Sequence, residues 1–262
     1  MSATDTTAKT NSAENAGTKT VATPRTAAGW KVILRRELAA YFSSPIAYIA
    51  GCFFLLFSGF TLFSTFFAIR RAELRNFFQM LPVIFSLFIP ALSMRAFSEE
   101  KRSGSFETLL TLPVSVTDIV TGKYLATLAA SLLMLLPTLF YVLTCSIFGS
   151  PDMGPIIGGY IGSVFLCAAF TAIGMYASSL TKNQIIAFFV AFAICIVLSA
   201  INNFAVLLPG TLVSFVSFIS ASSHFESISR GIVDTRDILY FISLTAVFLV
   251  LTVRSIENAR RG

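Results

Sequence analysis

The sequence is poor in charged residues. Only 12% of its 262 residues are Asp, Glu, Lys or Arg, whereas 55% are hydrophobic and the mean hydropathy is +0.80. Soluble domains carry about 25% charged residues. A chain of this size cannot hide so much apolar surface in one core. The composition therefore excludes an ordinary soluble domain, a nucleic-acid-binding domain and a disordered protein. We read the net charge of +6 as membrane topology or contact with anionic lipid.

Residues that build catalytic and metal sites are also scarce. The sequence has a single histidine, His224, and four cysteines, none of them spaced C-x-x-C. Each cysteine falls in an apolar run far from that histidine, so a zinc site is excluded. The cysteines are expected to be small apolar side chains in membrane helices, and His224 a loop residue. With no Ser/His/Asp spacing and no G-x-S-x-G motif, we expect no catalytic residue, metal or bound cofactor.

Six long apolar stretches predict membrane-spanning helices, because a span needs about 20 apolar residues. They lie near residues 45–69, 77–94, 124–148, 156–180, 185–208 and 237–254. The second contains Pro82 and Pro90 and is expected to be kinked. Most Lys and Arg residues fall on the side that also holds the N-terminus, which predicts that both termini are cytosolic.

The segments outside the spans differ in character. Residues 1–28 lack aromatic residues and predict a disordered cytosolic tail, which leaves 29–262 as the membrane domain. An interfacial helix is predicted before the first span, and it would end at a break before Pro45. Its characteristic residues are Trp30, Lys31, Arg35, Arg36 and Tyr41. The alternative is that this segment is the cytosolic end of the first span.

Polar side chains inside the spans are few. Thr171, Asn202 and Asn203 are candidates for lining a substrate path. The alternative is that they form hydrogen bonds between helices or lie near the interface. Gly158 and Gly162 form a small-xxx-small pair, which lets a neighbouring helix of this chain or of a second subunit approach closely. The apolar run 211–222 is too short to span and predicts a re-entrant or interfacial segment.

The loop at residues 95–123 combines charge with an apolar helix. Phe106 to Leu112 predict a short helix that Pro113 ends, and Thr117 is a fair N-cap for the helix that leads into the third span. Its apolar side chains are costly in water unless a partner or the bilayer surface covers them. The mixed signs of Glu99 to Arg102 suit a specific protein contact.

Three motifs carry a family resemblance. They are E-E-K-R-x-G-x-x-E-T-L-L-T-L-P-V-S-x-x-D-I-V-x-G-K (Glu99–Lys123), R-R-E-L-x-x-Y-F-x-S-P-I-x-Y (Arg35–Tyr48) and S-S-L-T-x-N-Q-I-I-A (Ser178–Ala187). With them the chain resembles, over about residues 30–255, the membrane subunits of ATP-binding-cassette (ABC) transporters of the type-2 export class. Within that class it is most similar to the gliding-motility-type permeases.

The resemblance implies roles for particular segments. The interfacial helix would be the amphipathic elbow, Ser103–Leu112 the cytosolic coupling helix, and 210–233 the re-entrant helices that close the outer gate. The implied ATPase-coupling residues are Glu99, Glu100, Gly104, Phe106, Glu107, Leu109, Leu110 and Pro113. The fold implied is an all-α membrane protein with six transmembrane helices.

The resemblance also implies partners. The chain would be one half of the membrane part of an exporter in the bacterial inner membrane, paired with a second permease half and with two ATPase subunits. The sequence has no G-x-x-x-x-G-K-[ST] motif, so ATP and magnesium would be bound by the ATPase subunits. Membrane lipids and an accessory extracytoplasmic protein complete the expected partners, with no nucleic acid.

Two other functions stay open on the residues alone. An ATP-independent channel or secondary transporter usually places charged groups in the middle of its spans, and these six stretches have none there. A structural membrane assembly protein would need no such groups. The Phe-, Leu- and Ile-rich spans suit lipids, apolar peptides or glycolipids as substrates, without selecting among them.

Overall fold

The structure of the chain is a computed structural model. It describes residues 29–69, 74–107, 114–149, 151–203, 216–232 and 234–261. Over these residues the fold is all-α, with no strand. The predicted tail, residues 1–28, lies outside the described residues, and so do Leu109, Leu110 and Pro113.

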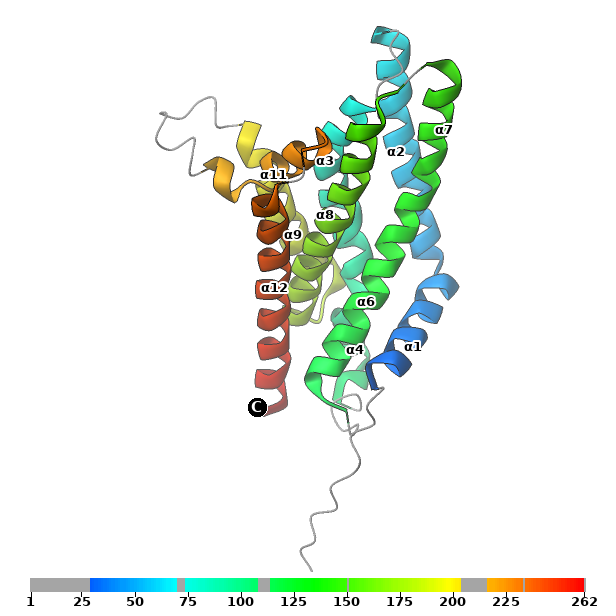
Figure 1. Cartoon of the computed structure of the whole chain (residues 1–262). Coiled ribbons are helices and arrows are strands. Elements are labelled where there is room, and N and C mark those ends of the chain that lie inside the picture. The colour runs from blue at the N-terminus through cyan, green and yellow to red at the C-terminus, as the bar shows by residue number, and fades with distance from the viewer. Residues whose placement is uncertain are drawn as a thin grey trace, which may run out of the picture.

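Six helical segments are long and apolar enough to cross a membrane, and the chain is therefore a multi-pass membrane protein. They are α2 (Pro45–Ile69), α3 (Arg75–Ser93) with α4 (Arg95–Ser103), α6 (Val116–Leu135) with the 3-10 turn η1 (Leu136–Thr138) and α7 (Leu139–Phe148), α8 (Met153–Leu180), α9 (Gln184–Ala200), and α12 (Thr235–Arg261). Figure 1 shows them side by side as a bundle.

Two shorter helices, α1 (Gly29–Ser43) and α11 (Ala221–Ser229), and single helical turns at residues 105–107 and 216–219 complete the described fold. The chain breaks between α1 and α2 at Ser44, as expected, because Pro45 fits the first position of a new helix. In Figure 1, α11 lies at one end of the bundle, and α4, the start of α1 and the C-terminal end of α12 lie at the other.

Several helix ends differ from their predicted positions. The third spanning segment begins earlier, at Val116, because Ser115 and not Thr117 caps it: the Ser115 hydroxyl accepts from the Asp118 amide at 3.1 Å. The same segment is interrupted by η1, where Pro137 removes a backbone donor. At its other end α9 gives way to a 3-10 turn at residues 201–203.

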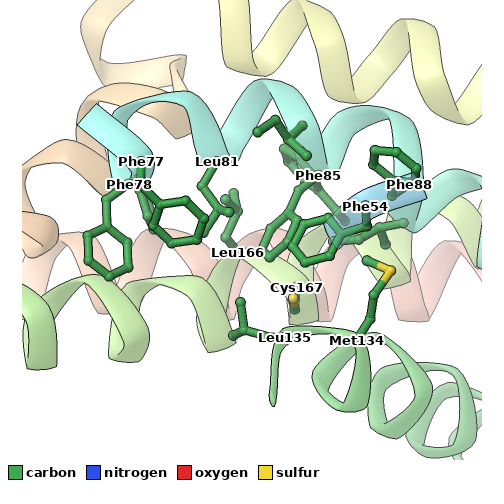
Figure 2. Packing of buried hydrophobic residues seen from close by; sticks show 14 of the residues in the cluster. Phe54, Phe77, Phe78, Leu81, Phe85, Phe88, Met134, Leu135, Leu166 and Cys167 are labelled. Atoms are coloured by element: carbon green, nitrogen blue, oxygen red, sulfur yellow. The ribbon is translucent and has the colours of Figure 1, made fainter. Parts of the chain in front are cut away.

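The core of the bundle is formed around α8, which packs against α3, α4, α6, α9, α11 and α12. Aromatic rings from α2 and α3 fill the space between α2, α3 and α6 (Figure 2). Phe54 of α2 stacks on Phe85 of α3, with 5.7 Å between the ring centroids. Cys167 lies in this core as a small apolar side chain, as predicted, whereas Cys52 is exposed on α2.

Glycines of α8 allow its neighbours to approach closely, and those neighbours belong to this chain. A Cβ atom added at Gly158 would lie 2.3 Å from the carbonyl oxygen of Ile228 in α11. One added at Gly162 would lie 3.1 Å from the ring of Phe225 in the same helix. The small-xxx-small pair therefore allows α11 to pack closely on α8. The sequence left open whether the neighbouring helix belongs to this chain or to a second subunit, and at these two glycines it belongs to this chain.

Candidate functional site

The α4 end of the bundle gathers the charged residues that the sequence singled out. α4 continues from α3 after Met94 and ends at Gly104, whose φ of +76° is the left-handed conformation that favours glycine at a helix C-terminus. Residues 105–107 then resume a helical turn. The predicted helix Ser103–Leu112 is therefore interrupted at Gly104, and its second half lies outside the described residues.

A buried lysine joins three helices at this end. Lys123 of α6 is 2% exposed, and its Nζ donates to Glu37 Oε1 of α1 and to Glu100 Oε1 of α4, each at 2.9 Å. The two carboxylates are 17% and 14% exposed. We call these three residues the ion cluster. Charges this well buried are stable only when paired, so the cluster fixes the relative positions of α1, α4 and α6.

Glu100 therefore faces inward. Its Oε1 is bonded to Lys123, and its Oε2 is buried with no hydrogen-bond partner among the described residues. Glu99 is placed differently: its side chain is 48% exposed and forms a two-bond salt bridge with Arg95 one turn earlier. Of these two predicted coupling residues, Glu99 lies on the surface and Glu100 belongs to the interior.

An apolar cluster lies beside the ion cluster. The ring of Phe97 is fully buried, 5.4 Å from Lys123 Nζ, and packs with side chains of α6. Phe106 joins the same cluster and is only 8% exposed. The expectation that a partner or the bilayer must cover this ring is wrong for Phe106, because the chain covers it. Lys101 Nζ lies 5.0 Å from the centre of the Phe106 ring.

The end of α8 holds the start of α4. Ser178 Oγ accepts from the amides of Phe97 and Ser98, each at 3.0 Å, and donates to the carbonyl oxygen of Met94 at 2.7 Å. Lys101 donates to the carbonyl oxygen of Ser179. The junction between α3 and α4 is therefore held by hydrogen bonds to α8 as well as by its own backbone.

α1 is anchored at both its ends. At its start, a Cβ atom on Gly122 of α6 would lie 2.8 Å from the Trp30 carbonyl oxygen, so the two backbones are in close contact. Near its end, the Tyr41 hydroxyl donates to the Leu92 carbonyl oxygen at 3.1 Å and lies 3.0 Å from Thr127 Oγ1. Burial raises the pKa of Tyr41 to about 12, so the phenol keeps the proton that it donates.

The surface of the α4 end is a short charged turn. Arg102, Ser103, Gly104, Ser105 and Glu107 are all exposed. We call these five residues the α4 turn. Two of the predicted coupling residues, Gly104 and Glu107, lie in it, beside Phe106, which is buried beneath them.

The candidate path-lining residues are not brought together. Thr171 is fully buried within α8, and its hydroxyl has no hydrogen-bond partner among the described residues. Asn202 is partly buried and Asn203 exposed in the 3-10 turn after α9. Because α8 and α9 run in opposite directions, this turn lies beside the start of α8, whereas Thr171 lies in its second half.

A second polar pair lies at the opposite end of the bundle. His224, expected in a loop, is in α11, and its Nδ1 lies 2.6 Å from Asp237 Oδ1 of α12. Its Nε2 lies 3.0 Å from the Phe218 carbonyl oxygen. The imidazole also stacks on Tyr240 with 4.2 Å between ring centroids. The pair therefore ties α11 to the last spanning helix.

This geometry defines the class of protein. Six spanning helices are preceded by a helix at the bundle end and divided after the second by a charged turn; no group of residues suited to a metal is found in the described part of the chain. Such a chain is a polytopic membrane protein, with buried and exposed charged residues gathered at the α4 end of its bundle.

Residues 46–258 match the family described as ABC-2 family transporter protein, and the chain belongs to this family. It is a permease subunit of an ABC transporter, in a family of membrane transport subunits that are generally non-catalytic and associate with ABC ATPase subunits. A search of curated proteins finds no matching sequence.

Proposed function

We propose that the chain is the transmembrane half of an ATP-driven exporter in the bacterial inner membrane, with both termini cytosolic. It would pair with a second permease half, identical or not, and with two ATPase subunits that bind ATP and magnesium. The α4 turn would be the part of the chain that the ATPase contacts. The observation that carries this proposal is the ion cluster, because it joins the helix behind the exposed turn to two other helices.

The same contacts suggest how movement would be transmitted. A push on the α4 turn would act on α4, which is bonded to α6 through Lys123, to α1 through the same lysine, and to α8 through Ser178. Packed helices linked in this way move as a rigid unit. Closure of the ATPase subunits would thereby tilt the second and third spans together and open the path outward.

The distribution of buried charge favours this proposal over a secondary transporter. In the described part of the chain, Lys123 and Asp237 are the charged residues whose burial is nearly complete. Asp237 lies in the first turn of α12 and Lys123 is the eighth residue of α6, so both lie in the first half of their helices. Coupling-ion sites are normally placed near the middle of the membrane. The energy for transport is therefore expected to come from outside the bundle.

Purification of the tagged chain in mild detergent tests the proposal. We expect an ATPase subunit to co-purify, the mass of the complex to correspond to two permease halves with two ATPase subunits, and ATP hydrolysis to depend on that association. A chain that never brings down an ATPase, under conditions in which it stays folded, would refute the exporter assignment. A structural assembly protein would likewise bring down no ATPase.

A further inference from the structure

An apolar groove opens between α1, α2 and α6. Its volume is about 410 Å³, and its walls include Leu38, Phe42, Cys52, Leu55 and Leu133. Phe42 and Leu133 are 48% and 44% exposed, so the groove faces the surroundings of the bundle rather than its core. We call it the α1–α2–α6 groove.

The groove offers little to a polar ligand. Tyr41 and Tyr48 also border it, but their hydroxyls are bonded within the chain, to the carbonyl oxygens of Leu92 and Phe42. A hollow lined by carbon and set against spanning helices is suited to an apolar chain. In a membrane that chain is supplied by lipid.

α1 places cations in line with the groove. Lys31, Arg35, Leu38 and Phe42 follow one another at spacings of four, three and four residues, so they share one face of the helix. Lys31 and Arg35 are exposed, and neither forms a salt bridge with any other described residue. Arg35 precedes Phe42 by two turns, or about 10 Å along the axis.

We propose that the α1–α2–α6 groove binds one acyl chain of an anionic phospholipid, whose phosphate is held by Lys31 and Arg35. Lys31 Nζ lies 5.6 Å from the centre of the Trp30 ring, and neither cation has an acidic partner among the described residues. An apolar hollow continued by two such cations is complementary to a molecule that joins an apolar chain to an anion. For a second copy of this chain to occupy the groove instead, it would have to present an apolar segment joined to an anion. The inference concerns the lipid-facing side of the subunit and does not depend on the ATPase assignment.

Photo-crosslinking tests the proposal in the intact protein. The full chain is placed in phosphatidylcholine nanodiscs that contain, in turn, a trace of phosphatidylglycerol or of phosphatidylcholine with a diazirine in the acyl chain. After irradiation, labelled peptides are identified by mass spectrometry. We expect labelling to concentrate on the peptides around Cys52 and Leu133, and phosphatidylglycerol to label them more strongly than phosphatidylcholine.

Two variants separate the headgroup from the acyl chain. In Lys31→Gln with Arg35→Gln, the preference for phosphatidylglycerol should fall about fivefold or more, because each basic residue near an anionic surface contributes about fivefold in affinity. Lys182→Gln, an exposed cation in the short connection after α8, is the control and should keep the preference.

The second variant, Gly51→Leu, fills the groove, and it should reduce labelling by both lipids. A Cβ atom at Gly51 meets only Met134 Cγ, at 4.0 Å, and Gly51 lines the groove, so the added side chain starts without a backbone clash and extends the groove wall. Ala193→Leu, which places the same leucine side chain on the exposed face of α9, should leave labelling unchanged.

Four results would overturn the proposal. The first is equal labelling by the two lipids in the unmodified protein. The second is labelling spread evenly over the exposed faces of α2, α9 and α12. The third is groove labelling that Gly51→Leu does not reduce. The fourth is groove labelling that is present in monomers and absent from dimers, because the occupant of the groove in the dimer would then be a second copy of this chain.

Discussion

The hydroxyl of Ser178, near the end of α8, donates to the carbonyl oxygen of Met94, the residue between α3 and α4, at 2.7 Å. The hydroxyl oxygen of Ser178 in turn accepts from the amides of Phe97 and Ser98. Met94 has no side chain able to cap a helix, and no side-chain cap is present at the start of α4. A serine from another helix therefore supplies the acceptor that the first turn of α4 lacks.

Ser178→Ala should destabilise the protein by about 1–3 kcal/mol, because it leaves two buried amides and one carbonyl without this partner. The measurement is thermal unfolding in detergent. Ser243→Ala is the control, since that exposed hydroxyl bonds only to a carbonyl of its own helix, at Tyr240. Equal unfolding temperatures for the two variants would contradict the role assigned to Ser178.

The ion cluster predicts a larger effect that a second change reverses. Lys123→Met should cost about 3–5 kcal/mol, because Glu37 and Glu100 would be left as two buried carboxylates without a cation. Adding Glu37→Gln and Glu100→Gln to it should recover most of the stability. Thermal unfolding of the single and triple variants is the test, and a triple variant less stable than the single one would be the contrary result.

Glu107→Lys separates folding from association with the ATPase. Glu107 is exposed in the α4 turn and forms no salt bridge with another described residue, so its reversal should leave the unfolding temperature unchanged. On the proposed function it should sharply reduce the ATPase that co-purifies. Arg260→Glu, an exposed reversal near the end of α12, is the matched control. Normal co-purification of Glu107→Lys would remove the α4 turn from the interface.

The spans could be predicted from sequence because hydropathy is a local property. The helix ends were harder, since they depend on single side chains: Ser115 and Thr117 are both good N-caps, and only the structure shows which hydroxyl meets the Asp118 amide. Pro137 was likewise hidden in an apolar run, although its missing donor interrupts the third spanning segment.

The ion cluster could not be predicted, because Lys123 and Glu37 are 86 residues apart and no local pattern connects them. One signal was present: Glu37 is an acidic residue in a helix whose other charges are basic. Glu100 and Phe106 looked exposed because the loop around them is charged. Their burial follows from the packing of α4 and the turn after it on α6, which is tertiary information.

Gly158 tests the packing of α11 on α8. In Gly158→Ala the new Cβ would lie 2.3 Å from a backbone oxygen, that of Ile228, so the two helices must separate, at a cost of about 1–3 kcal/mol. Gly51→Ala is the control, and it should be neutral or stabilising by about 0.5–1 kcal/mol, because that site has room and alanine favours the helix. Thermal unfolding compares them, and a Gly158→Ala protein as stable as the control would contradict the close contact.

The pair formed by His224 and Asp237 should hold α11 against α12. Asp237 Oδ2 is buried without a hydrogen-bond partner in the described structure, so His224→Leu would leave that carboxylate without its ring contact, at a cost of about 1–3 kcal/mol. Hydrogen exchange in the α11 amides should then rise. Glu226→Gln is the matched control within α11: it breaks a more exposed salt bridge with Arg230, worth about 0.3–0.5 kcal/mol, and should change exchange little. Unchanged exchange in His224→Leu would show that the glycine contacts with α8 hold α11 by themselves.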